Sequence, residues 1–234
     1  ASGITFIIIM KLADYSAPRV QEYFGLPGVS LPHTETVSWA PICILMDKVY
    51  DKIPGINKIH FDGETIQKRF GIIGEPMVLG LILGAGLGAL AGYEPNKIIT
   101  LGVNMAAVMF ILPRMVRILM EGLMPLSEDA KKFLAKKFPG KEVNIGMDAA
   151  IATGSPMVIS AALIMIPVTL LLAVILPGNR VLPLVDLATL PFFMIWPVVA
   201  SKGNLFRSLI TGTLMMIAIL YIATNLAGTA TLIA

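Results

Sequence analysis

The sequence predicts an all-α polytopic membrane protein with about five membrane-spanning helices and two re-entrant segments in its 234 residues. The first observation is composition: hydrophobic residues make up 56% and charged residues 14% of the chain, against about 25% charged in typical soluble domains. The second is a mean hydropathy of +0.81. The third is that several uncharged stretches approach the roughly 20 residues needed to cross a bilayer core about 30 Å thick. Lipid is therefore the expected solvent for much of the surface.

Five stretches are expected to span the bilayer, because each is apolar and close to the required length. They are residues 76–93, 97–114, 157–176, 181–201 and 208–227. A sixth apolar run, residues 4–10, is interpreted as the end of a membrane helix whose beginning is missing. The chain is therefore expected to be a fragment of a longer protein.

The distribution of basic residues predicts which side of the membrane the loops occupy. Loops 48–69, 114–141 and 202–207 hold 14 of the 18 Lys and Arg residues. Cytoplasmic loops are enriched in these residues, so all three are placed in the cytoplasm. Within the predicted cytoplasmic loop 114–141, lysines alternate with Phe133, Leu134 and Phe138. This pattern predicts a short amphipathic helix at the membrane surface, either a solvated basic face or a docking surface for a partner.

The first predicted re-entrant segment covers residues 24–46. Three prolines and two glycines between residues 24 and 41 interrupt any helix there, and the apolar run that follows, residues 36–46, is too short to span. His33 and Glu35 lie at the interruption. An imidazole and a carboxylate in this position can hydrogen-bond the hydroxyls of a polyol, although an ordinary polar interfacial loop would look similar.

The second predicted re-entrant segment covers residues 142–156, and it ends where Gly154, Ser155 and Pro156 break a long uncharged stretch. Asp148 directly precedes that stretch and is either a hydroxyl acceptor or a helix cap. Glu75 stands at the start of a glycine-rich apolar helix, where a carboxylate is costly without a partner or function. It is either a second acceptor or an interfacial residue at a helix start. The glycines at 80, 84, 86 and 88 are expected to allow close helix packing.

Several other functions are disfavoured. A net charge of +3 is too small to indicate a nucleic-acid partner, and a single cysteine, Cys43, excludes an internal disulfide and a multi-cysteine metal site. His33, Glu35 and His60 have neither the number nor the spacing typical of a metal site. No metal and no cofactor are expected.

A set of short segments, in this order, resembles one known family. They include Ser30-Leu31-Pro32-His33, Lys52-Ile53-Pro54-Gly55-Ile56-Asn57-Lys58-Ile59, Gly74-Glu75-Pro76, Met120-Glu121-Gly122-Leu123, Pro177-Gly178-Asn179 and Gly203-Asn204-Leu205-Phe206-Arg207. Together they resemble the galactitol-type enzyme IIC component of the bacterial phosphoenolpyruvate-dependent sugar phosphotransferase system, in the ascorbate/galactitol superfamily. Family members are roughly twice as long, so the chain is expected to be a central-to-late fragment of this transmembrane transport domain.

The resemblance implies a multi-pass protein of the bacterial inner membrane that forms a homodimer and works by an elevator mechanism. It implies a core domain with two re-entrant hairpins that holds a galactitol-like polyol or sugar. A separate IIB subunit would phosphorylate the substrate from its own phosphocysteine, so Cys43 inherits no role. His33, Glu75 and Asp148 fall on motif positions suited to substrate binding. Thr34-Glu35-Thr36 replace the small residues expected after His33, which leaves a related polyol or sugar open.

The chemistry of phosphoryl transfer asks mainly for positioning of the substrate hydroxyl. No catalytic residue is assigned with certainty, but Glu75 or Asp148 could accept the hydroxyl proton. The main alternative is an ion-coupled secondary transporter of a small polar solute, in which these two carboxylates bind a cation or proton. A more distant alternative is an intramembrane enzyme that uses His33 and Glu35.

Overall fold

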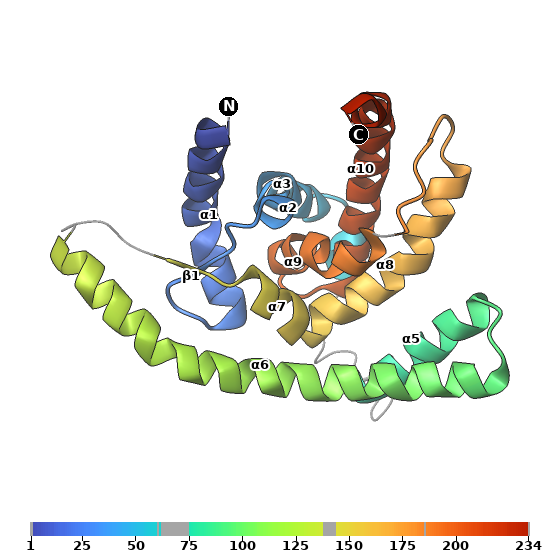
Figure 1. Ribbon diagram of the computed structural model, residues 1–234, viewed down its shortest axis with the longest axis horizontal. Coiled ribbons are helices and arrows are strands. Elements are labelled where there is room, and N and C mark those ends of the chain that lie inside the picture. The colour runs from blue at the N-terminus through green and yellow to red at the C-terminus, as the bar shows by residue number, and fades with distance from the viewer. Residues whose placement is uncertain (1, 60, 62–74, 138–143, 185, 234) are drawn as a thin grey trace.

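The structure is a computed structural model that describes residues 2–59, 61, 75–137, 144–184 and 186–233; His60 lies outside the described residues. The described chain is helical apart from two short paired strands and the connecting loops (Figure 1). The longer helices are α1 (Ser2–Phe24), α3 (Ala40–Tyr50), α5 (Pro76–Leu90), α6 (Pro95–Lys137), α8 (Pro156–Ile175), α9 (Leu190–Ala200) and α10 (Leu205–Ile233). The shorter elements are β1 (Val29–Ser30), α2 (Thr34–Val37), β2 (Ile145–Gly146), α7 (Asp148–Gly154) and the 3-10 turns Ile56–Lys58 and Asp186–Thr189.

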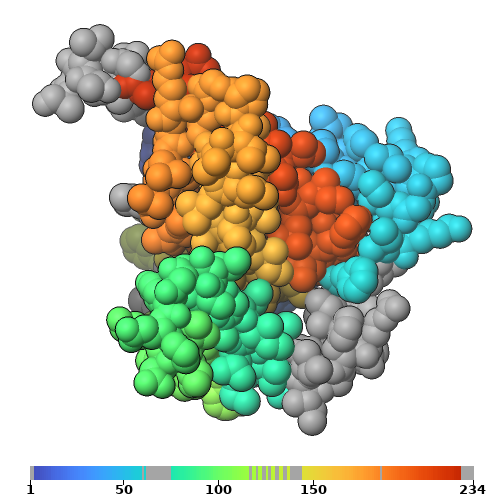
Figure 2. All heavy atoms as spheres, turned by 90° about the vertical axis from the view of Figure 1, so that its right-hand side faces the viewer, coloured from blue at the N-terminus to red at the C-terminus, as the bar shows by residue number. Residues whose placement is uncertain are grey.

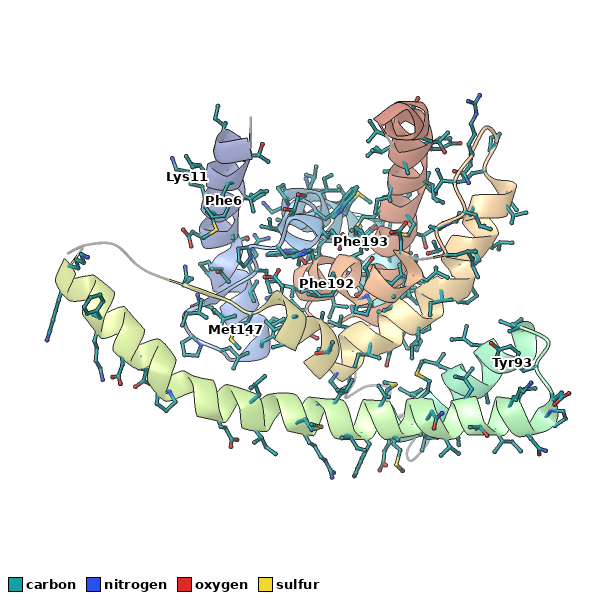
Figure 3. All side chains as sticks on the ribbon, viewed as in Figure 1. Phe6, Lys11, Tyr93, Met147, Phe192 and Phe193 are labelled. Atoms are coloured by element: carbon teal, nitrogen blue, oxygen red, sulfur yellow. The ribbon has the colours of Figure 1, made fainter. Side chains whose placement is uncertain are left out.

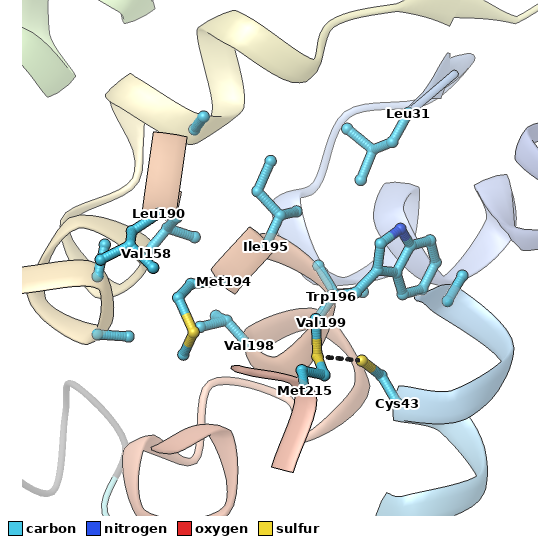
Figure 4. Close-up of a cluster of buried hydrophobic side chains, with 14 of the residues drawn as sticks. Leu31, Cys43, Val158, Leu190, Met194, Ile195, Trp196, Val198, Val199 and Met215 are labelled. Atoms are coloured by element: carbon cyan, nitrogen blue, oxygen red, sulfur yellow. Dashed lines mark hydrogen bonds between the residues drawn. The ribbon is translucent and has the colours of Figure 1, made fainter. Parts of the chain in front are cut away.

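Helix α9 forms the centre of the larger hydrophobic core. It carries no charged residue and packs against α1, α2, α3, α7, α8 and α10. Trp196, Ile195 and Val198 are fully buried on it, and Figure 4 shows them between Leu31 of the β1 segment and the side chains of neighbouring helices. A helix that is apolar all round is stable only when it is surrounded by protein or lipid. Its composition therefore accounts for its central position.

Three described helices are long and apolar enough to cross a membrane: Pro95–Met115 within α6, Pro156–Ile175 and Leu205–Ala227. They coincide with the predicted spans 97–114, 157–176 and 208–227. Their outward side chains include Val174 and Ile222, which are 77% and 52% exposed. Large exposed apolar surface is typical of contact with lipid or other protein. The structure therefore supports an all-α membrane fold.

Two other predicted spans differ from the structure. The stretch 76–93 contains only the 15-residue helix α5, which covers about 22 Å and is shorter than a bilayer core. The stretch 181–201 is not one helix: it contains a loop, a 3-10 turn and the 11-residue helix α9. Pro183 and Pro191 account for the interruption, because proline lacks the amide proton that a continuing helix requires. Hydropathy alone does not detect this break.

The predicted loop 114–141 is also corrected, because α6 continues without interruption to Lys137. Its 43 residues correspond to about 65 Å, roughly twice the bilayer core. Pro113 and Pro125 lie inside this helix without ending it. Proline is tolerated in membrane helices where the freed carbonyl groups find other partners. The cytoplasmic placement of residues 114–141 stays a prediction, and residues 138–141 lie outside the described residues.

The N-terminal apolar run is not the end of a helix, since α1 continues to Phe24. Ala13, Ser16, Ala17 and Val20 are buried on one face of α1, at the spacing of an amphipathic helix. The charged residues lie on the opposite, exposed face: Lys11, Asp14, Arg19 and Glu22. Small side chains on the buried face let α1 approach the core closely, which explains how a charged helix can follow the apolar run.

Helices α5 and α6 form a tight hairpin with its own small hydrophobic cluster against α8, built on Met109, Ile159 and Leu163. Figure 2 shows this hairpin in green beneath α8. A Cβ added at Gly80 or Gly84 would lie 2.8 Å from a backbone carbonyl oxygen of α6. The expected packing role is thus confirmed at both positions. It is wrong for Gly86, where a Cβ would meet nothing within 4 Å.

We expect Gly84→Ala to destabilise the full-length protein by about 1–3 kcal/mol, because the added methyl group overpacks the contact with Leu101 and Met105. The matched control is Gly86→Ala on the same helix. It adds the same methyl group in open space and should be neutral or stabilise the helix by up to about 1 kcal/mol. Reversible unfolding in mixed micelles measures both changes. Equal effects of the two substitutions would contradict the proposed packing.

Candidate functional site

Two segments that are far apart in the sequence meet as a short parallel strand pair. Val29 of β1 pairs with Ile145 of β2, and Ser30 pairs with Gly146. The amide of Ile145 donates to the carbonyl of Gly28, and the amide of Met147 donates to that of Ser30. These strands belong to the two predicted re-entrant segments, whose backbone interruptions the structure confirms. Their re-entrant placement in a membrane stays a prediction, and residues 142 and 143 lie outside the described residues.

The strand pair sets Asp148, at the start of α7, beside His33, which precedes α2. The backbone amide of His33 donates to Oδ1 of Asp148 at 3.2 Å. Asp148 is only 8% exposed. A carboxylate can accept about four hydrogen bonds, so the bond from His33 leaves acceptor capacity for further donors. A buried carboxylate of this kind can bind hydroxyl groups strongly, because hydrogen bonds to charged groups contribute about 1.5–3 kcal/mol each.

The side chains around this pair differ in their surroundings. The imidazole of His33 is exposed, and its ring centre lies 5.2 Å from that of Phe192 on α9, labelled in Figure 3. Glu35 is half-buried on α2, and its carboxylate makes no hydrogen bond or ion pair within the described part of the chain. An aromatic ring beside polar groups is typical of sites that bind small polar ligands with apolar faces.

A network of amide side chains, which the sequence did not predict, supports the strand pair from outside. Nε2 of Gln21 on α1 donates to the carbonyl of Val29 and to Oδ1 of Asn144, both at 3.1 Å. Nδ2 of Asn144 donates to Oδ1 of Asp14 at 3.1 Å. Helix α1 therefore connects to both broken segments at once. The polar residues of α1 form no recognisable motif. The amphipathic spacing of α1 is the sequence feature that could have pointed to this network.

Glu75 has no described contact with the other three predicted residues. It precedes Pro76 at the start of α5, and α5 packs against α6 and α8. No hydrogen bond or ion pair within the described ranges joins Glu75 to His33, Glu35 or Asp148. It does stand at a helix start, as the alternative interpretation expected, and whether it lies at the membrane interface or in the site stays a prediction. The described contact thus joins His33 and Asp148, and Glu35 follows two residues after His33 on α2. That these residues form a binding site stays a prediction.

A second polar cluster, here called the charged end, lies where α3 ends and α10 begins. Nη1 of Arg207, a residue only 6% exposed, contacts Oδ1 of Asp47 at 3.0 Å and Oδ1 of Asp51 at 2.8 Å. Asn204 bonds to the carbonyl of Ile59 at 2.6 Å. Burial raises the pKa of the Asp47 carboxyl above its usual range, and the Arg207 guanidinium acts in the opposite direction. The cluster thus joins two loops that were predicted on the same side of the membrane.

The turn after α9 shapes the charged end. The amide of Gly203 donates to the carbonyl of Val198 at 2.8 Å, and that of Lys202 donates to Val199 at 3.1 Å. This pair of bonds is the Schellman motif, which ends a helix with a residue in the left-handed region. Here that residue is Lys202, with φ of 52°, although glycine is usual. The side chain of Lys202 therefore extends from the sharp turn at the end of α9. Its Nζ lies 3.7 Å from Oε1 of Glu22.

These features define a multi-pass helical membrane protein whose broken helices hold a buried carboxylate. The chain matches the family described as PTS system sugar-specific permease component (EIIC-GAT) over residues 1–234, and it belongs to that family. This confirms the resemblance found in the sequence.

Three curated relatives come from Escherichia coli. The galactitol-specific EIIC components of strain K12 and of O157:H7 are each 43% identical over 220 residues, covering 94% of this chain and 49% of each relative. A permease IIC component of strain K12, whose designation is provisional, is 44% identical over 218 residues, covering 93% of this chain and 50% of the relative. The chain thus spans about half the length of these relatives. No solved structure gives a significant match.

Proposed function

We propose that the chain is part of a membrane permease that binds a galactitol-like polyol or sugar and presents it to a phosphorylated IIB subunit in the bacterial inner membrane. Membership of the family and the similarity to galactitol-specific components support the substrate class. The observation that carries the proposal is the strand pair that fixes Asp148 against His33. A neutral polyol offers only hydroxyl groups, and an acceptor-rich carboxylate beside an imidazole suits them.

The lengths of α3 and α9 support access to this site from the charged end. Both helices begin near His33 and end at the charged end, and each has 11 residues. Eleven helical residues cover about 16 Å, which is half of a bilayer core about 30 Å thick. Transporters commonly bind substrates near the membrane midplane at interrupted helices. A substrate held at Asp148 would lie no farther than about one such helix length from the cytoplasmic loops.

The chemical role proposed for Asp148 is to orient one hydroxyl and to accept its proton as the phosphoryl group arrives. Positioning supplies most of the rate in such reactions, so few further groups are required from the permease. The phosphoryl donor would be the phosphocysteine of the IIB subunit. Cys43 is unsuited to that role, because it is 1% exposed and its Sγ lies 3.5 Å from Sδ of Met215 (Figure 4).

We also propose that the protein is a homodimer working by an elevator mechanism. The described helices divide into two hydrophobic clusters: a large one around α9, and a small one where α5 and α6 meet α8. The large cluster contains both broken segments and suits a moving substrate-holding core. The α5–α6 hairpin contacts it through both α7 and α8, and it suits part of the scaffold.

The test uses the full-length protein in vesicles together with its soluble partners. Labelled galactitol should accumulate as its phosphate ester only when phosphoenolpyruvate and the IIB subunit are present. Galactitol recovered unphosphorylated after uptake driven by an ion gradient would instead support the secondary-transporter alternative. Related hexitols, pentitols and ascorbate, tested in the same assay, would establish which substrate is preferred.

A further inference from the structure

The charged end contains two hollows that the proposed substrate site does not use. One, of about 430 Å³, is lined by α1, α3 and the end of α9, and includes Arg19, Lys48 and Lys202. The other, of about 330 Å³, is lined by Asp51, Lys202 and Arg207 among others. Asp47 and Lys202 line both hollows. In Figure 2 the α3 segment and the loop after it, in cyan, lie beside the orange-red start of α10.

The acidic groups of these hollows already have partners, whereas two of the cations have none among the described residues. Asp47 and Asp51 contact Arg207, and Glu22 contacts Lys202. Arg19 and Lys48 line the larger hollow, are exposed, and make no ion pair within the part of the chain that the structure describes. Four cationic and three acidic side chains line the two hollows in all. The charge that has no ion-pair partner among the described residues is therefore positive.

A buried donor of a residue that lines the smaller hollow also lacks an acceptor among the described residues. Nε of Arg207 is shielded from solvent and has no hydrogen-bond partner among the described residues. Arg207 itself is 6% exposed. Buried donors in native proteins are almost always paired, either with protein groups or with ordered water. Arg19 and Lys48, which are exposed at the larger hollow, are the groups that an anionic ligand would meet there.

We propose that the charged end binds a phosphoryl group, carried either by the sugar phosphate that leaves the permease or by the partner subunit that approaches it. The proposal rests on the proposed function, which places phosphoryl transfer about one 11-residue helix away. Arg and Lys are the usual ligands of phosphate, through charge-assisted hydrogen bonds. A neutral polyol gains nothing from these charges. Arg19 and Lys48 bind the phosphate oxygens at the rim and steer the dianion electrostatically.

The test compares two doubly substituted full-length proteins that lose the same charge. Arg19→Gln with Lys48→Gln removes the two uncommitted cations, and Lys97→Gln with Lys132→Gln removes two exposed cations elsewhere. Binding of inorganic phosphate, of a hexitol phosphate and of galactitol is measured by calorimetry. The first variant should bind both phosphates at least about tenfold more weakly and galactitol unchanged. The second should match the parent protein for all three ligands.

Two further measurements identify the source of the phosphoryl group. If the partner carries it, the first variant needs a higher concentration of phosphorylated IIB for half-maximal phosphorylation. If the sugar phosphate carries it, that concentration is unchanged and product inhibition weakens instead. Equal phosphate affinity in the two variants, or no phosphate binding by the parent, overturns the proposal. Failure of the parent to bind galactitol would refute the proposed function separately, because neither phosphate probe depends on it.

Discussion

Replacing Asp148 with asparagine is expected to weaken polyol binding by about ten- to a hundredfold. The amide keeps an oxygen that can accept the His33 amide, so the contact between the two broken segments survives. It loses the charge that strengthens bonds from hydroxyl groups, and each such bond contributes about 1.5–3 kcal/mol. Calorimetry with the full-length protein and galactitol measures the change. Phosphorylation by the IIB subunit should fall further than binding if Asp148 also accepts the hydroxyl proton.

The control is Glu75→Gln, which makes the same chemical change at a carboxylate lying at the start of α5. Because that carboxylate has no described contact with Asp148, binding should change by no more than about twofold, an effect of less than about 0.5 kcal/mol. His33→Ala and Glu35→Gln should give intermediate losses, since the backbone of His33 contacts Asp148 and Glu35 lies two residues farther along the chain. Normal binding and phosphorylation by Asp148→Asn would place the substrate elsewhere in the full-length protein.

The sequence predicted part of this site because backbone breaks and isolated polar residues are visible without a structure. Both interruptions, near His33 and at Gly154–Pro156, follow from proline and glycine. The contact between His33 and Asp148 could not be derived, since it depends on pairing between two strands of only two residues each. Strands so short have no detectable alternation. Glu75 was grouped with His33 and Asp148 because a carboxylate at the start of an apolar helix gives the same sequence pattern wherever that helix packs.

The fold was predictable where an apolar stretch is also a continuous helix. Residues 157–176 meet both conditions, and α8 occupies nearly the same positions. Residues 181–201 meet only the first, because hydropathy is insensitive to the prolines that divide them. In residues 114–137 the opposite error occurs. Charged residues and Pro125 resemble a loop there, yet the helix continues. Helical continuity depends on hydrogen-bond partners, which composition does not reveal.

Arg207→Met is expected to reduce the free energy of unfolding by about 3 kcal/mol. Removing one partner of a buried ion pair leaves an uncompensated charge and typically costs about 3–5 kcal/mol. The side chain of Asp47 is 22% exposed and that of Asp51 62%, so most of the loss should come from Asp47. Unfolding of the full-length protein in mixed micelles provides the measurement. Asp47→Asn combined with Arg207→Met should recover part of the loss, because the two residues are coupled.

The matched control is Lys202→Gln, a few residues away in the same loop. Its ion pair with Glu22 has side chains 81% and 73% exposed, and exposed pairs contribute about 0–1 kcal/mol. The control should therefore unfold almost as the parent does. An Arg207→Met variant as stable as Lys202→Gln would mean that the Arg207 cluster is solvated in the full-length protein. It would then not connect α3 to α10.

The strand pair between β1 and β2 has a consequence for how such a permease can diversify its cargo. The pairing bonds run between backbone amides and carbonyls, which all residues except proline can supply. Gly146 is the exception, because a Cβ added there would lie 2.6 Å from Cγ of Pro32. If the proposed function holds, substitutions at Thr34 and Glu35, which are not buried, would alter which hydroxyl pattern is recognised while the pairing of β1 with β2 is kept. Because the main chain makes this pairing, side chains nearby can change without altering the fold. Under the proposed function, a new sugar preference would then need single side-chain substitutions and no change in the strand pair.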